Sequence, residues 1–82
     1  MIFLVDYHRP TGRTLLFKTF DESERLKAQR ERLQIELDAH RQGLLMEREI
    51  LLLEARDQQV LRRTHERYFR HLPEPASEPI EI

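Results

Sequence analysis

The chain has 82 residues, a net charge of −1, 35% charged residues and no cysteine. This length allows one small domain, whose single core contributes only about 3–5 kcal/mol of net stability. Without cysteine, neither a disulfide nor a thiolate zinc site can add to that stability, so we expect self-association, as a homodimer, to supply the rest. The balanced charge argues against nucleic acid or a membrane surface as the main partner.

The first residues, Met1 to Val5, are apolar, but Asp6 interrupts the run. The run is too short for the hydrophobic region of a signal peptide and has no basic residues before it. No other stretch approaches the roughly 20 apolar residues that span a bilayer. We therefore expect a cytoplasmic protein without a membrane segment.

Residues 2–7 and 13–20 are rich in β-branched, aromatic and aliphatic side chains, and a short polar segment separates them. Within that segment Pro10 fixes the backbone of an early turn position and Gly12 can adopt a positive φ. Two such runs around a Pro/Gly loop predict an antiparallel β-hairpin.

A helix is predicted to begin at Asp21, because Asp21 and Glu24 have the spacing of a capping box. Gly43 is placed to end this helix in a left-handed conformation. The expected core-facing line of the helix is formed by leucines that lie within about 20° of one another: Leu26, Leu33, Leu37 and Leu44. A weaker apolar line on the opposite side is our first candidate for a subunit contact; it consists of Ala28, Ile35 and Ala39.

Residues after Gly43 admit two interpretations. Leu, Met, Glu, Arg and Ala dominate residues 44–56, which favours a continued helix and a fold made of an N-terminal β-hairpin plus an antiparallel helical hairpin. The alternative is a strand at 47–55, since the apolar run Ile50 to Leu53 has the length of a strand buried on both sides. Asp57 is then a good N-cap for a new helix. Because an apolar pattern restarts after Asp57, we favour the strand.

The predicted fold class is therefore α+β: a small β-β-α-β-α domain over residues 1–72. The first strand lies between the other two and antiparallel to both, and two helices cover one face of a three-stranded sheet. The opposite sheet face would remain uncovered and apolar, which offers a second possible interface. Residues 73–82 contain three prolines and three acids, so we expect a disordered acidic tail.

The last helix is expected to bury an apolar line that runs through Leu61, Thr64, His65, Tyr68, Phe69 and Leu72. Thr64, His65 and Glu66 are sequence neighbours, which do not face one another on a helix, so they do not predict a catalytic group. A single histidine without a second ligand on its face does not predict a zinc site. Two glycines in the whole chain leave no phosphate-binding loop. We expect no enzyme activity, no metal and no cofactor.

The opposite face of this last helix would carry Arg63, Arg67 and Arg70 at helical spacing, a candidate contact for phosphate or for an acidic partner. The sequence thus favours a small intracellular protein-interaction or structural module that acts as a homo-oligomer without catalysis. The alternative is a nucleic-acid-associated accessory protein that uses the arginine line.

Overall fold

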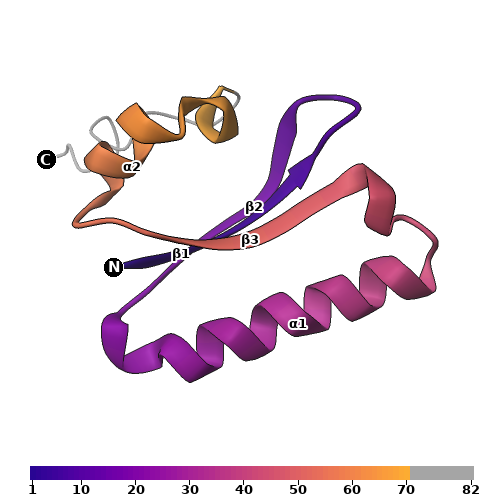
Figure 1. Cartoon of the computed structure of the whole chain (residues 1–82), viewed down its shortest axis with the longest axis horizontal. Coiled ribbons are helices and arrows are strands. Elements are labelled where there is room, and N and C mark those ends of the chain that lie inside the picture. Colours follow the sequence, from indigo (N-terminus) through magenta and orange to yellow (C-terminus); the bar gives the residue numbers. More distant parts are fainter. Residues whose placement is uncertain (71–82) are drawn as a thin grey trace, which may run out of the picture.

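A computed structural model describes residues 1–70 and shows a three-stranded sheet between two helical layers (Figure 1). This confirms the α+β class and the predicted order of strands and helices. The predicted tail at 73–82 lies outside the described residues. The elements are β1 (Ile2–His8), β2 (Arg13–Phe20), α1 (Arg25–Arg41), β3 (Arg48–Glu54) and α2 (Gln58–Thr64), with 3-10 turns η1 (Glu22–Glu24), η2 (Leu45–Glu47) and η3 (Glu66–Phe69).

The sheet has the strand order β2-β1-β3, and β1 is antiparallel to both neighbours, as predicted. Val5 at its centre pairs with Phe17 on one side and Leu51 on the other. The register of β1 with β2 shifts after Asp6, where Leu15 is the extra residue of a β-bulge. The predicted hairpin and its turn are confirmed, because Gly12 has a φ of 71° and donates its N–H to His8 O at 2.9 Å.

Gly43 ends α1 as predicted, with a φ of 72°. The N–H of Gly43 donates to His40 O at 3.0 Å and the N–H of Leu44 donates to Ala39 O at 2.9 Å. These two bonds form a Schellman motif, which satisfies the last carbonyls of the helix. The chain therefore leaves the helical direction here, and the continued helix of the alternative fold does not form.

Two aspartates start the helical segments, as the sequence predicts. Asp21 forms a complete capping box with Glu24, although a 3-10 turn precedes the α-helix itself. The Asp57 carboxylate accepts the N–H of Val60 at 2.9 Å and caps α2. Between these caps, β3 occupies most of the predicted range 47–55. Both of its faces are apolar, as expected of a strand with a packed layer on each side.

The two helices lie on opposite faces of the sheet, which corrects the prediction that both cover one face (Figure 1). The first cluster of buried residues combines one face of β1 with α2 and η3: Phe3, Val5, Tyr7, Leu61, Tyr68 and Phe69. The second combines the other face with α1: Ile2, Leu4, Phe20 and Ala28. Since both faces of β1 carry large apolar side chains, helices on both sides keep more apolar surface from water than helices on one side. The sheet face that was expected to be free is therefore covered.

Candidate interaction surfaces

The face of α1 that packs on the sheet is formed by Ala28, Ile35 and Ala39, here called the alanine face. Ala28 and Ala39 are fully buried, and Ile35 packs against the cluster beneath α1. The prediction that this face contacts another subunit is therefore wrong. Small side chains let the helix backbone approach the large residues of the sheet closely, so the face with the smaller side chains is the one that packs. Leucine content alone does not identify this face.

Ion pairs on both sides of the alanine face stabilise the orientation of α1 in which this face packs on the sheet. On one side Lys18 of β2 lies 2.8 Å from Glu31 of α1. On the other side Arg25 lies 2.5 Å from Glu54 of β3 and 2.6 Å from Glu22. Hydrogen bonds from Arg25 lower the pKa of the Glu54 carboxyl, while Glu54 and Glu22 raise the pKa of Arg25. These contacts tie the first half of α1 to both edge strands.

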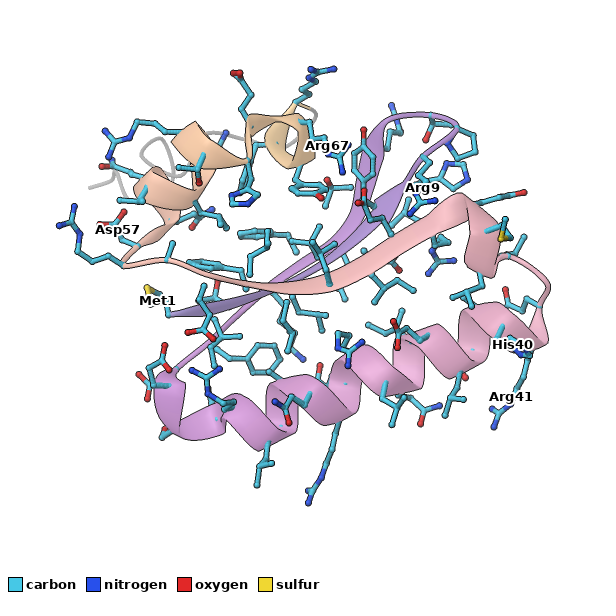
Figure 2. The ribbon with its side chains drawn as sticks, in the orientation of Figure 1. Met1, Arg9, His40, Arg41, Asp57 and Arg67 are labelled. Atoms are coloured by element: carbon cyan, nitrogen blue, oxygen red, sulfur yellow. The ribbon has the colours of Figure 1, made fainter. Side chains whose placement is uncertain are left out.

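The opposite side of α1 presents Leu26, Leu33 and Leu37, here called the leucine face. Their side chains are 68%, 52% and 43% exposed, so the line expected to form the core faces solvent instead. Leu44, the fourth residue of the predicted line, lies beyond the helix and is half-buried. Figure 2 shows side chains of α1 that point away from the sheet, on the side of the helix opposite to it. A row of exposed leucines along one helix is typical of an interaction surface.

The arginine line predicted for the last helix is not assembled. α2 ends at Thr64, and His65 leaves the helical conformation with φ −132° and ψ 50°. Arg67 and Arg70 follow in and after a 3-10 turn, so the helical spacing from Arg63 no longer places all three on one face. Of the predicted apolar line, Leu61, Tyr68 and Phe69 are buried, whereas Thr64 is exposed and Leu72 lies outside the described residues.

Arg67 is held in place by contacts with neighbouring side chains (Figure 2). Its Nη2 lies 2.7 and 2.8 Å from the two carboxylate oxygens of Glu49 on β3 and donates to Tyr68 Oη at 3.0 Å. Its guanidinium also lies over the rings of Tyr7 and Tyr68, at 5.3 and 4.9 Å from their centroids. The hydrogen bond to Tyr68 is the main reason that the pKa of Arg67 is raised. Arg67 therefore fastens η3 onto the sheet.

Thr64 and His65 do face each other, contrary to the expectation from their adjacency. The Thr64 hydroxyl lies 2.8 Å from His65 Nδ1, because the chain leaves the helix between them. The His65 ring stacks on Tyr68 with centroids 6.2 Å apart. Within residues 1–70, no carboxylate forms a hydrogen bond or an ion pair with His65, so the pair lacks the third group that would orient a base. A surface hollow beside it is lined by Arg63, Thr64, His65, Glu66, Arg67 and Tyr68.

A buried ion pair between Asp6 and Arg48 is not predicted by the sequence patterns. Asp6 is only 3% exposed and lies on the α1 side of the sheet. In the sequence, Asp6 marks only the end of an apolar run. The signal that could have found the pair is an aspartate within an otherwise apolar central strand, since a buried carboxylate needs a partner.

Among the described residues, no group of three histidine, aspartate or glutamate side chains could hold a metal ion. Over the same part of the chain, no helix has both the length and the apolar character needed to cross a membrane. No protein-family model matches the sequence, and neither a curated protein nor a solved structure matches it. Functional inference therefore depends on the surfaces described above, among them the leucine face, which places three exposed leucines along one helix.

Proposed function

We propose that this protein is a small interaction or structural module that acts as a homo-oligomer through the leucine face of α1 and has no catalytic activity. The observation that carries the proposal is the exposure of Leu26, Leu33 and Leu37 on one side of a seventeen-residue helix. Single exposed leucines are ordinary in soluble proteins, but a row of them on one helix is not.

The size of the domain supports the same proposal. A leucine that passes from full exposure to full burial contributes about 1.5–3 kcal/mol, so each of these half-exposed leucines would contribute roughly half of that. Because the domain core contributes only about 3–5 kcal/mol of net stability, a contact through the leucine face would be comparable to it. The cost of bringing two copies together reduces this gain, so we expect a dimer rather than a permanent large assembly.

The alternative, binding of nucleic acid through the arginines, has less support. Glu49 and two tyrosine rings already hold Arg67, and the net charge of the chain is −1. Arg63 and Arg70 remain exposed but lie on different segments. Two separated cations are too few for an electrostatic footprint on a phosphate backbone.

Sedimentation velocity over a range of concentrations tests the proposal. We expect the wild-type chain to shift from a 10.0 kDa species to a dimer as concentration rises. Leu33→Glu should abolish this shift, because it places two charges in the contact. Leu15→Glu is the matched control: Leu15 is 53% exposed, almost the same as Leu33, but it lies on β2 rather than on α1. A wild-type chain that stays monomeric at high micromolar concentration would contradict the proposal.

A further inference from the structure

The leucine face belongs to a longer seam with the spacing of a coiled coil. Arg30 and His40 lie on the same side of α1, so the seam positions alternate by four and three residues: Leu26, Arg30, Leu33, Leu37 and His40. With Leu26 and Leu33 at heptad position d, Leu37 takes position a. The orientation of a second copy on this seam can be inferred from its flanking charges, and that inference rests on the proposed function.

The two flanks of this seam carry opposite charges. The flank at the e positions consists of Lys27, Gln34 and Arg41 and contains no acid. The flank at the g positions consists of Gln29 and Glu36 on α1, continued backwards by Glu22 in η1, and contains no base. Charges at e and g positions set the orientation of paired helices.

This separation distinguishes the two possible orientations. In an antiparallel pair each flank faces its own copy, which places the basic flank against the basic flank and the acidic against the acidic. In a parallel pair in register, the g flank of one helix faces the e flank of the other. Glu36 then lies beside the partner's Arg41, and Gln29 beside the partner's Gln34. We infer that two copies of this chain associate through a parallel, in-register pairing of their α1 helices.

The rest of the molecule is compatible with that pairing. The leucine face is on the side of α1 opposite the alanine face, so the two sheets would lie outside the helix pair (Figure 1). Glu36 already pairs with Arg32 at 3.0 Å, and Arg41 with Asp38 at 3.5 Å. The Arg32–Glu36 pair is half-buried and the Arg41–Asp38 pair is exposed; pairs between neighbouring turns of a helix are weak, so both can rearrange at little cost.

The seam is short and partly polar. Arg30 and His40 occupy two of its five positions, and a polar residue at a seam position lowers stability while restricting the assembly to dimers. The long stem of Arg30 can still cover apolar surface while its charge reaches solvent. With so small a contact, we expect a dissociation constant on the order of micromolar.

Cysteine cross-linking tests the orientation directly, because the chain contains no cysteine of its own. In the parallel pair, two copies of Leu26→Cys place their thiols across the twofold axis and should form a disulfide on mild oxidation. In an antiparallel pair that matches Leu26 with the partner's Leu37, the two substituted positions would lie roughly 16 Å apart. A disulfide needs Cα atoms within about 7 Å, so the two thiols could not join.

A mixture of Leu26→Cys and Leu37→Cys chains tests for the antiparallel pairing. The parallel pairing predicts 26–26 and 37–37 disulfides and no mixed product above the level given by Leu15→Cys, which reports random collisions. A dominant 26–37 disulfide would overturn the orientation while leaving the homodimer intact. A wild-type chain that shows no dimer in sedimentation would instead overturn the proposed function, so the two failures are distinguishable.

Charge reversal provides an independent test. Glu36→Arg and Arg41→Glu should each weaken the dimer about three- to tenfold, since each removes two symmetric pairs. The double variant restores the complementary pair in a parallel dimer and should recover most of the wild-type affinity. An additive loss in the double variant would contradict the pairing of these two residues.

Discussion

Asp6 and Arg48 are joined across β1 and β3 by two hydrogen bonds, one of which, from Arg48 Nε to Asp6 Oδ1, is 2.7 Å long. The second runs from Arg48 Nη2 to Asp6 Oδ2. Asp6 is almost fully buried, and Arg48 is 18% exposed. This bidentate pair neutralises the one charged residue in the centre of the sheet, and the hydrogen bonds to Asp6 raise the pKa of Arg48.

Removing one member of this pair should destabilise the fold severely. Arg48→Met leaves the Asp6 carboxylate buried without its partner, which costs about 3–5 kcal/mol of unfolding free energy. Because this loss is comparable to the whole net stability of the domain, circular dichroism without denaturant should show Arg48→Met largely unfolded. The double variant Asp6→Leu/Arg48→Met removes both charges and should recover most of the stability, while urea denaturation measures the wild type and the double variant. Similar stability of Arg48→Met and wild type would show that the pair is not buried as described.

Gly43→Ala should lower the unfolding free energy by about 1 kcal/mol, because it forces a side chain into the left-handed conformation. A Cβ at this position would meet no atom within 4 Å, so the loss reports backbone strain alone. Gly43→Asn is the control: asparagine tolerates this conformation better and should lose less. Equal losses for both variants, measured by thermal unfolding, would argue against a strained cap.

Acid should weaken the fold partly through the cap of α2. The hydrogen bond from the N–H of Val60 holds the pKa of Asp57 below its usual value of 3.8. The unfolded chain therefore binds the proton more tightly, and the contribution of this group is present above about pH 4 and lost as pH falls through the lowered pKa. Asp57→Asn keeps a capping oxygen but cannot titrate. Thermal midpoints from pH 6 to pH 2 should fall less steeply for Asp57→Asn; an identical slope would contradict this role.

Arg67→Gln should cost about 1 kcal/mol, because it removes the ion pair with Glu49 and the contacts with two tyrosine rings. Arg63→Gln is the matched control: Arg63 is exposed on α2 and should change stability by less than about 0.5 kcal/mol. Chemical denaturation measures the loss of unfolding free energy for both variants. If Arg67→Gln were neutral while weakening binding of a nucleic acid, the alternative function would be favoured.

Arg30→Leu should strengthen self-association, because it replaces a charge in the seam with a side chain that packs. Arg30 forms no ion pair with any other residue in the range 1–70, so the substitution breaks no ion pair among these residues. We expect the dissociation constant to fall about tenfold or more. Arg63→Leu adds a leucine elsewhere on the surface and should leave the constant unchanged. If Arg30→Leu also left the dissociation constant unchanged, the contact between the two copies would lie elsewhere.

Sequence reasoning located the elements because their ends depend on local chemistry. Asp21, Gly43 and Asp57 each act through bonds within a few residues, and each has the predicted role. The rotation of α1 and the side on which α2 packs depend on tertiary contacts instead. The leucine face and the alanine face are both compatible with a helix, and only the fit of small side chains against the sheet decides between them.

The same distinction explains the candidate sites. The predicted arginine line requires one helix that continues through Arg70, but the chain leaves the helix after Thr64. That change of conformation also brings Thr64 and His65 into contact. The Asp6–Arg48 pair joins residues 42 positions apart, a separation that no local pattern reveals.

The central claim, that a second copy covers the leucine face, is tested most directly by the exposure of the leucine methyl groups in solution. NMR relaxation by a soluble paramagnetic agent measures this for each methyl group at concentrations below and above the dimer midpoint. We predict that Leu26, Leu33 and Leu37 lose much of their exposure at high concentration while Leu15 keeps its own. Equal and unchanged exposure of Leu33 and Leu15 at every concentration would contradict the account.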